Sequence, residues 1–305
     1  MDKILITGIS GFIGSSIAES LVKKYNVSAV IRKSTNLWRC KEFLADVNFK
    51  YIEQLSDNNV NQMEEYDAII HCAWDGVENK DRDNWIKQIG NISILFSLIN
   101  KYKTKKIICF GSQAEYGIEG RLDENIICKP NTSYGAAKAA LKDLLQTFCA
   151  QKQIELYWLR IFSLYGPKQD TKWFIPNAII RMLRNEPLDL TKCEQKYDYL
   201  FIKDLVDSIG FILENKIPAD VYNLSGNSSH KLYSVIEKIK DIVNSNSTIN
   251  FGKLPYRQNQ PMHIEGDSSK FLSRSSLSLT PIEDGLRVTV EYYRNIKKKE
   301  NNESV

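Results

Sequence analysis

Tyr134 and Lys138 stand four residues apart in the segment SYGAAKAA, and Ser112 lies 22 residues upstream of Tyr134 in FGSQAEYG. On a helix, a spacing of four places both side chains on one face. A phenol exchanges protons poorly near neutral pH, because its ordinary pKa is about 10. A nearby ammonium favours the phenolate and lowers that pKa. With the Ser112 hydroxyl holding the same substrate oxygen, the three residues could support hydride transfer to or from a carbonyl carbon.

The spacing of Tyr134 and Lys138 does not decide the matter by itself. Both residue types are common on helices. A half-buried tyrosine packed beneath a lysine that extends to solvent would give the same pattern. The elements that would position these residues are therefore needed to choose between the two interpretations.

Three glycines near the start of the chain give a second signal. Gly8, Gly11 and Gly14 follow an apolar strand expected over Lys3–Thr7, and apolar residues then recur at helical spacing over Phe12–Lys24. The first glycine permits a tight turn, the second lets the backbone approach a diphosphate, and the third lets helix and strand pack closely. The helix N-terminus attracts phosphates. In this context the glycines predict a dinucleotide coenzyme rather than a plain glycine-rich turn.

The end of the second expected strand, Ser28–Ile31, bears on the choice of coenzyme. Proteins that prefer NAD usually have Asp or Glu there, bonded to the ribose hydroxyls. This chain has Arg32 and Lys33 instead. A guanidinium can bind a 2′-phosphate through paired hydrogen bonds, whereas a carboxylate would repel it. The sequence therefore favours NADP(H); if the two charges are merely solvated, NAD(H) is the alternative.

The composition excludes several classes of protein. Of the 305 residues, 43% are hydrophobic and 26% charged, as in soluble proteins that bury a full core. The net charge of +4 is spread along the chain, which argues against nucleic-acid binding and suits a diphosphate substrate. Six cysteines lack metal-ligand spacing, so reduced core thiols and no metal are expected. No apolar run reaches transmembrane length and a strand begins at residue 3, which predicts a cytoplasmic protein without membrane contact.

Strands and helices alternate from Lys3 to about Gly166, which predicts an α/β fold with a Rossmann-type, doubly wound parallel sheet. From residue 167 to 295 the pattern is irregular, and a smaller C-terminal lobe is expected. Residues 296–305 are charged, lack apolar periodicity and are expected to form a frayed tail. Further strands are predicted over Ala68–Cys72, Lys106–Phe110 and Glu155–Arg160, and helices over Trp85–Asn100 and Tyr134–Lys152.

Six motifs occur in order along the chain: TGISGFIG, IIHCAW, FGSQAEYG, SYGAAK, RIFSLYGP and DYLFIKD. On these motifs the chain resembles the extended short-chain dehydrogenase/reductases, and within them the nucleotide-sugar epimerase/dehydratase branch. The resemblance runs from Lys3 to about Tyr293. It implies that residues 1–166 bind the dinucleotide and that residues 167–295 mainly bind a nucleotide-sugar substrate, with the chain crossing between the lobes. It also implies a homodimer.

The resemblance further implies roles for single residues. Tyr134 would donate the proton, Ser112 would bond the carbonyl oxygen, and Lys138 would lower the pKa of Tyr134 and bond the nicotinamide ribose. The residues implied in coenzyme binding are Gly8, Gly11, Phe12, Ile13, Gly14, Arg32, Lys33, Ala73, Tyr134 and Lys138. Those expected to contact the sugar nucleotide are Trp74, Asn177 and Arg257, with a core aromatic, a surface amide and a surface ion pair as the respective alternatives.

Other polar residues are expected to have supporting roles. His71 lies in an apolar strand, where a hydrogen-bonded core histidine is commoner than a catalyst. Asp198 and Tyr199, in the motif DYLFIKD, are expected to support the pocket or the base. Arg160 matches a stretch that the resemblance places beside the nicotinamide.

The residues after Ser112 bear on the reaction. Dehydratases of this branch typically read Thr-Asp-Glu here, with two carboxyls for loss of water from the sugar. This chain reads Ser112-Gln113-Ala114, and neither an amide nor a methyl can act as a general acid or base. Dehydration is therefore disfavoured. Glu115, one position later, is expected to point elsewhere.

Reduction and epimerisation at C4 of the sugar are the two enzymatic alternatives. A reductase must exchange spent coenzyme for fresh NADPH, whereas an epimerase profits from tightly held NAD, so Arg32 and Lys33 favour reduction. The blocks HCAWDG, GSQAEYG and KLPYRQNQPM also resemble reductases of dTDP- or CDP-linked 4-keto-6-deoxyhexoses, which serve deoxysugar and O-antigen (lipopolysaccharide) biosynthesis. The nucleotide, the sugar and the configuration at C4 stay open. A non-catalytic NADP-binding module is a remote alternative, because such chains commonly lose the tyrosine or lysine that this one retains.

Overall fold

The computed structural model describes residues 2–53, 64–77 and 84–303, with side chains as far as residue 298. The chain divides into two compact units. Unit 1 comprises Met1–Ile118, Glu124–Ile161 and Val206–Asn223, and unit 2 comprises Glu119–Asp123, Phe162–Leu205 and Leu224–Val305. The expectation that one part binds the coenzyme and the other the substrate stays a prediction.

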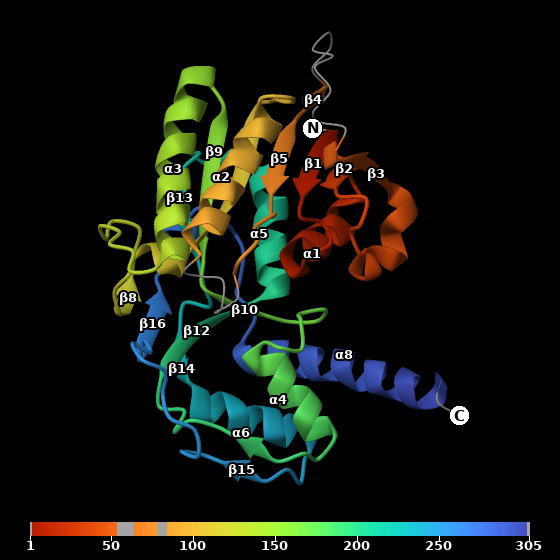
Figure 1. Ribbon diagram of the computed structural model, residues 1–305, viewed down its shortest axis with the longest axis vertical. Helices are drawn as coiled ribbons and strands as arrows, with labels where there is room; N and C mark the ends of the chain where they lie inside the picture. The colour runs from red at the N-terminus through yellow and green to blue at the C-terminus, as the bar shows by residue number, and fades with distance from the viewer. Residues whose placement is uncertain (1, 54–63, 78–83, 304–305) are drawn as a thin grey trace. The chain divides into compact units, whose positions relative to one another are not determined.

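Unit 1 is built on a seven-stranded sheet with the order β13-β9-β7-β5-β1-β2-β3 (Figure 1). Every pair from β9 to β3 is parallel. The strands are β1 (Lys3–Thr7), β2 (Asn26–Ile31), β3 (Val47–Tyr51), β5 (Ala68–His71), β7 (Lys106–Ser112), β9 (Glu155–Ile161) and β13 (Val221–Leu224), with a small separate pair formed by β4 (Glu65–Tyr66) and β6 (Lys103–Thr104).

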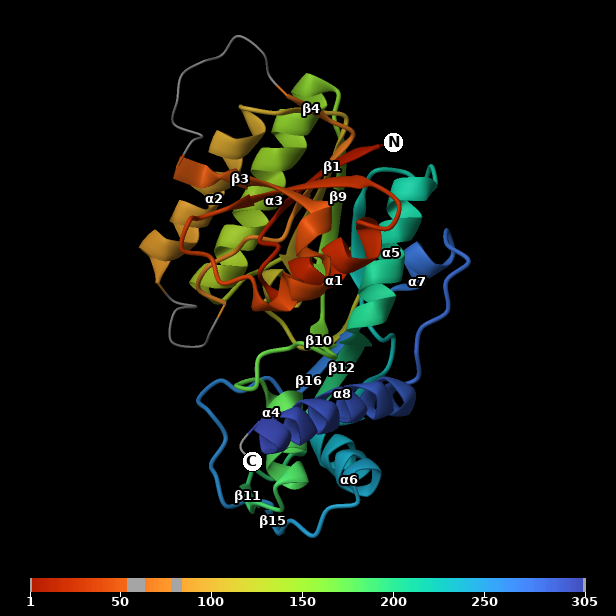
Figure 2. The same cartoon turned by 90° about the vertical axis from the view of Figure 1, so that its right-hand side faces the viewer.

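Helices cover both faces of this sheet. Figure 2 shows α2 and α3 on one side and α1 and α5 on the other, so the predicted doubly wound arrangement is confirmed. The helical segments are α1 (Phe12–Leu21), α2 (Trp85–Ile99), α3 (Ser133–Lys152), α5 (Ile202–Glu214) and the 3-10 segments η1 (Trp38–Asp46) and η3 (Gln113–Glu115). Each strand and helix that the sequence predicts in this region is present within three residues of its expected ends, and β3, β4, β6 and β13 are additional strands.

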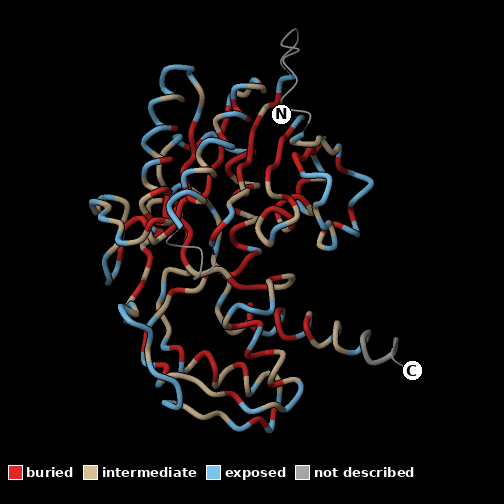
Figure 3. The backbone as a smooth tube through the Cα atoms, in the orientation of Figure 1, coloured by how far each residue is buried: buried red, intermediate tan, exposed pale blue. Residues whose placement is uncertain are grey.

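The core of unit 1 explains why its strands read as continuous apolar runs. Leu5, Ile69 and Ile107 belong to the cluster packed under α2 and α3, with Leu95 and Leu145 from those helices. The alternate strand residues are equally inaccessible, because a helix layer covers the other face as well. Figure 3 shows the buried residues following the strands of this unit.

Unit 2 contains a second, smaller sheet with the order β10-β12-β16-β8, to which β14 adds by pairing antiparallel with β12. Its elements are β8 (Gly120–Leu122), β10 (Ser163–Tyr165), α4 (Phe174–Leu183), β11 (Leu188–Asp189), β12 (Lys196–Phe201), β14 (Ser229–Lys231), α6 (Leu232–Val243), β15 (Ile249–Asn250), β16 (His263–Gly266), α7 (Ser269–Leu272) and α8 (Ile282–Glu303).

The end of α8 differs from the frayed tail expected over 296–305, because the helix continues to Glu303. Part of the physical reason is a tertiary contact that apolar periodicity does not register: Lys297 Nζ donates a hydrogen bond to the Leu183 carbonyl at 2.6 Å. In the part of the chain that the structure describes, no helix is both long enough and apolar enough to cross a membrane.

Candidate active site

Ser112 is the last residue of β7 and the first anchor of the site. Its Oγ accepts a hydrogen bond from the Ala114 N–H at 3.1 Å, and its own N–H donates to Glu115 Oε1 at 2.8 Å. The second bond is one half of a capping box at the start of η3, in which the Ser112 side chain also accepts the backbone N–H of Glu115. The serine is 8% exposed, so its backbone is fixed while its hydroxyl lies at the end of the strand.

Tyr134 lies in the first turn of α3, and the start of this helix is set by two contacts. The Thr132 side chain accepts the Gly135 N–H at 3.1 Å and caps the helix. A Cβ on Gly135 would stand 2.3 Å from the Ala114 carbonyl oxygen, a distance that only glycine permits. The first turn of α3 therefore packs directly on the turn that follows Ser112, which brings Tyr134 to that turn.

Lys138, one turn further along α3, points inward. Its ammonium donates to the Phe110 carbonyl at 2.8 Å and lies 5.9 Å from the centroid of the Tyr134 ring. Because the side chain is buried, its pKa is lowered to about 8, against the opposing effects of Cys109, Glu115 and Cys72. A lysine that extends from Tyr134 to solvent, the alternative interpretation of the spacing, is therefore wrong.

Trp74 completes this group from the loop after β5. Its indole lies across Lys138, with Nζ 3.6 Å from the ring centroid, and meets Tyr134 edge to face at a centroid distance of 6.2 Å. The residue also packs against the core cluster of unit 1. Its two sequence-based interpretations, a pocket wall and a core aromatic, are thus compatible.

The Glu115 side chain, which accepts the Ser112 N–H, makes further contacts within unit 1. The carboxylate is fully buried, pairs with Arg160 Nε at 2.9 Å and accepts from Trp158 Nε1. Arg160 also donates to the Tyr116 hydroxyl at 3.1 Å. The arginine therefore neutralises a buried carboxylate, and both side chains support the turn that carries Ser112.

The glycine loop of unit 1 is shaped for close backbone approach. Gly8 has a φ of +71°, and a Cβ there would stand 2.6 Å from the Ala73 nitrogen. Helix α1 begins after Gly11, and no side chain caps it among the described residues. Uncapped N–H groups at a helix N-terminus, behind a turn in which Gly8 leaves no room for a Cβ, fit the diphosphate of a dinucleotide. Phe12, Ile13 and Gly14 form the first turn of that helix.

Two residues beside this loop have structural contacts. Thr7 Oγ1 accepts from the Ala73 N–H at 3.2 Å and bonds His71 Nδ1 at 2.8 Å. Burial and the charge of Lys138 lower the pKa of His71 to about 3, so the ring is neutral. The expectation of a hydrogen-bonded core histidine is confirmed.

The basic residues after β2 differ in their surroundings. Arg32 and Lys33 are exposed, and the Lys33 N–H donates to Glu53 Oε1 at 3.3 Å. Arg39, in η1, donates from Nη1 to the Ser10 carbonyl of the glycine loop at 3.2 Å. Sequence reasoning missed both Glu53 and Arg39. Only the pairing of β3 with β2 and the packing of η1 on α1 bring them to this end of the sheet.

Gln88 and Asn91 of α2 were also missed, although a polar pair at i and i+3 on the buried side of an apolar helix is a usable signal. Gln88 Oε1 accepts from Trp74 Nε1 at 2.8 Å, and its Nε2 donates to the Gly76 carbonyl at 2.8 Å. The Asn91 amide pairs with both backbone groups of Asp75 at 2.9 Å. These bonds hold the loop that carries Trp74.

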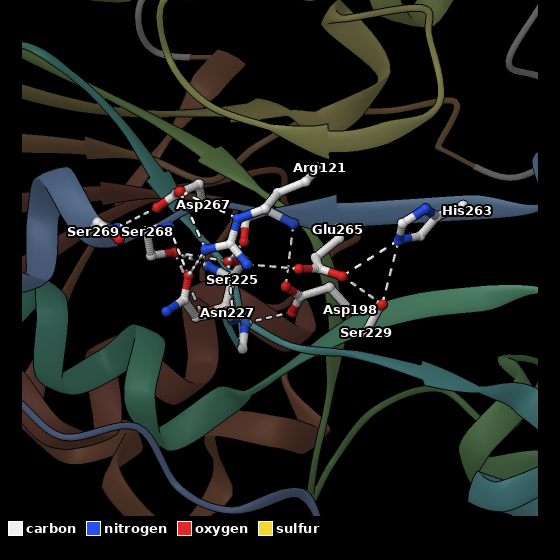
Figure 4. Close-up of polar contacts among 12 residues, drawn as sticks. Arg121, Asp198, Ser225, Asn227, Ser229, His263, Glu265, Asp267, Ser268 and Ser269 are labelled. Atoms are coloured by element: carbon white, nitrogen blue, oxygen red, sulfur yellow. Dashed lines mark hydrogen bonds and ion pairs between the residues drawn. The ribbon is translucent and has the colours of Figure 1, made fainter.

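Unit 2 has a polar cluster of its own (Figure 4). Arg121 of β8 lies between Glu265 and Asp267, with ion pairs of 2.7 and 3.1 Å. Asp198 of β12 accepts the N–H groups of Gly226 and Gly266. Burial raises the pKa of Asp198 to about 7, against the opposing effect of these hydrogen bonds. The cluster fastens the strands and loops of this sheet to one another.

Three residues of unit 2 remain to be placed. Tyr199 of β12 meets Tyr165 edge to face at 6.1 Å. Asn177, on α4, and Arg257, in the loop after β15, are exposed. The roles expected for these residues stay predictions.

Comparison with known proteins decides the family. A sequence model described as the NAD dependent epimerase/dehydratase family matches residues 4–225. The chain belongs to this family. The predicted resemblance to the extended short-chain dehydrogenase/reductases is thereby confirmed.

Relatives within the family carry several different activities in their names. The dTDP-D-glucose 4,6-dehydratase of Dictyostelium discoideum is 29% identical over 79% of this chain, and this chain spans only 62% of its length. The CDP-abequose synthase of Salmonella muenchen is 28% identical over 93% of this chain and 96% of its own. The solved UDP-glucuronic acid 4-epimerase of Bacillus cereus, in complex with UDP-glucuronic acid and NAD, has a TM-score of 0.83 at 24% identity and covers 96% and 99% of the two chains. At that identity the likeness establishes the fold alone.

Proposed function

We propose that this member of the family is an NAD(P)-dependent nucleotide-sugar 4-ketoreductase. It reduces the 4-keto group of a dTDP- or CDP-linked 4-keto-6-deoxyhexose. The observation that carries the proposal is the arrangement in unit 1. The buried Lys138 ammonium lies 5.9 Å from the centroid of the Tyr134 ring, and the first turn of α3, which carries Tyr134, packs on the turn after Ser112. Ser112, Tyr134 and Lys138 are the proposed catalytic residues.

The chemistry divides between coenzyme and protein. The reduced nicotinamide supplies a hydride for the carbonyl carbon. Tyr134 gives its phenolic proton to the carbonyl oxygen as negative charge develops there, and the charged Lys138 stabilises the phenolate that remains. Because Ser112 Oγ accepts from the Ala114 N–H, its own O–H can donate to the same oxygen. Two oriented donors therefore act where the charge appears.

Dehydration finds little support among the residues of the site. Gln113 and Ala114 offer no carboxyl, and Glu115 is committed to Arg160. A 4-epimerase with tightly held NAD is the second candidate. It is favoured by the carboxylate of Glu53 beside Lys33, which would suit a ribose hydroxyl better than a phosphate.

The substrate and the assembly follow from the same proposal. Trp74, Asn177 and Arg257 are the proposed contacts with the sugar nucleotide, and the protein acts in the cytoplasm. A homodimer is supported by isoleucines on α2, since Ile86 is 86% exposed and Ile89 is 59% exposed. A second copy covering this face would remove it from water.

Purified protein given dTDP-4-keto-6-deoxyglucose or its CDP counterpart, with NADPH and NADH in separate reactions, should oxidise coenzyme. The amount oxidised should equal the amount of a new deoxyhexose product. Coenzyme that stays reduced while UDP- or GDP-linked hexoses are epimerised would replace the reductase by the second candidate.

The coenzyme preference is tested by comparing two arginines. Arg32→Ala should weaken NADPH binding at least 10-fold and NADH binding little, because only NADPH carries the 2′-phosphate that a guanidinium binds. Arg39→Ala is the matched control variant. Because Arg39 bonds the glycine loop, which both coenzymes would contact, its loss should weaken NADPH and NADH binding equally. Binding is measured by the change in nicotinamide fluorescence. An equal loss of both coenzymes in Arg32→Ala would refute the 2′-phosphate contact.

A further inference from the structure

The indole ring of Trp74 contacts the Lys138 ammonium, whose positive charge the proposed reaction uses. The Lys138 ammonium is 3.6 Å from the centroid of the indole ring, closer than its 5.9 Å separation from the Tyr134 ring. The same indole meets the Tyr134 ring edge to face, with 85° between the ring planes. One aromatic side chain thus contacts both members of the Tyr134–Lys138 pair.

The orientation of this indole is fixed from α2. The Trp74 N–H donates to Gln88, and Gln88, which is fully buried, passes a second hydrogen bond to the Gly76 carbonyl. Asn91 holds Asp75 by both of its backbone groups. Hydrogen bonds therefore fix Trp74 at its ring nitrogen and fix the backbone of the two residues that follow it. A side chain that only filled space in the core would not require these hydrogen bonds.

The buried ammonium needs such a partner. Lys138 is 5% exposed, and its ammonium donates a hydrogen bond to the Phe110 carbonyl at 2.8 Å. Taking an ammonium out of water favours the neutral amine. The π-face of an indole attracts a cation and does so more strongly where water is excluded. The face of Trp74 thus opposes the loss of the proton from Lys138.

The other titratable groups near Lys138 come from four elements and the loop after β5. They are His71 of β5, Cys72 after it, Cys109 of β7, Glu115 of η3 and Tyr134 of α3 itself. His71 is neutral, and Glu115 is neutralised by Arg160. Together with the Phe110 carbonyl, the indole face is a contact that stabilises the ammonium without itself titrating.

We propose that Trp74 is a positioning residue of the reaction, whose indole face keeps the Lys138 ammonium charged and in place beside Tyr134, with Gln88 fixing the orientation of the indole. This role deepens the proposed function and rests on it for its catalytic consequence. The contact itself is a property of the protein without substrate. The two can therefore be tested separately.

The contact is tested first, by fluorescence of the protein without ligands. The chain has five tryptophans, so the emission of Trp74 is obtained by subtracting the emission spectrum of Trp74→Phe from that of the wild type. It should titrate with a midpoint near pH 8, the pKa of Lys138. The same difference measured in a Lys138→Met background should be flat in this range. A Trp74 signal that does not titrate in wild type, or that titrates equally in Lys138→Met, overturns the contact whatever the enzyme's substrate is.

The catalytic consequence is tested by the pH profile of kcat, with three variants. Trp74→Leu removes the π-face and should move the alkaline limb to lower pH by about half a unit to one and a half units, because Lys138 then loses its proton more easily. Trp74→Phe keeps a π-face, so its pH profile should lie close to that of the wild type. Trp85→Leu, at the exposed start of α2, is the control and should leave the profile unchanged. Equal pH profiles for the Leu and Phe variants of Trp74, or a change in KM alone, would contradict the positioning role and leave Trp74 only as a residue that lines the pocket.

Discussion

Replacing Tyr134 by Phe is expected to lower kcat by about 10²–10⁴-fold, the usual contribution of a positioned general acid. The substitution removes one hydroxyl and keeps the ring, so the edge-to-face contact with Trp74 at 6.2 Å persists. Coenzyme affinity should change by less than about threefold, since the glycine loop and the start of α1 are untouched. Stopped-flow measurement of coenzyme oxidation and a binding titration separate the two effects.

Tyr102→Phe is the matched control for this substitution. Tyr102 belongs to the same unit and is nearly buried, and its ring meets Tyr66 edge to face at 5.4 Å, away from the residues of the site. Its loss of a hydroxyl should leave kcat unchanged. Turnover by Tyr134→Phe at the wild-type rate would show that another group supplies the proton, and the assigned acid would be wrong.

Glu115→Gln should have the largest effect on stability, with a loss of about 3–5 kcal/mol in the free energy of unfolding. The substitution leaves the Arg160 guanidinium charged, buried and without its carboxylate at 2.9 Å. The amide oxygen can still accept the Ser112 N–H, so the turn that carries Ser112 can form in the folded protein. Urea denaturation followed by circular dichroism gives the free energy.

Two comparisons decide whether the cost comes from the unpaired charge. The double variant Glu115→Gln with Arg160→Met removes both charges and should lose less than the sum of the single losses. Lys24→Ala breaks an exposed pair with Glu214, in which the two side chains are 65% and 45% exposed, and should change the free energy of unfolding little because water screens the pair. A loss below about 1 kcal/mol for Glu115→Gln would mean that the buried pair contributes no more than the exposed one.

The local parts of the site follow directly from the sequence. The spacing of Tyr134 and Lys138, the glycines before α1 and the strand predicted over Lys106–Phe110 all depend on residues a few positions apart. Helical and strand periodicity determine where such side chains point, so these relations hold whatever the rest of the chain does. For the same reason the apolar strands and amphipathic helices predicted the doubly wound sheet, which needs helices on both faces of buried parallel strands.

Other relations arise only where distant segments meet. Glu115 and Arg160 lie 45 positions apart, and their pairing depends on β9 lying beside β7. Glu53 reaches Lys33 through the pairing of β3 with β2, so the absence of an acid at the end of β2 did not mean the absence of a carboxylate there. Likewise, no periodicity indicates that Trp74 covers Lys138.

The sequence by itself thus determined the spacing of Tyr134 and Lys138, the glycine loop and most strands and helices of unit 1, because hydrogen bonding and side-chain direction along one element are local. The tertiary structure decided which charges are neutralised and which stay available. Burial sets the free energy of a charge, and burial depends on the contacts of every neighbouring element. Lys138 is the clearest case: its place on α3 follows from the sequence, while its lowered pKa and its contact with Trp74 require β5, β7 and α2 to pack around it.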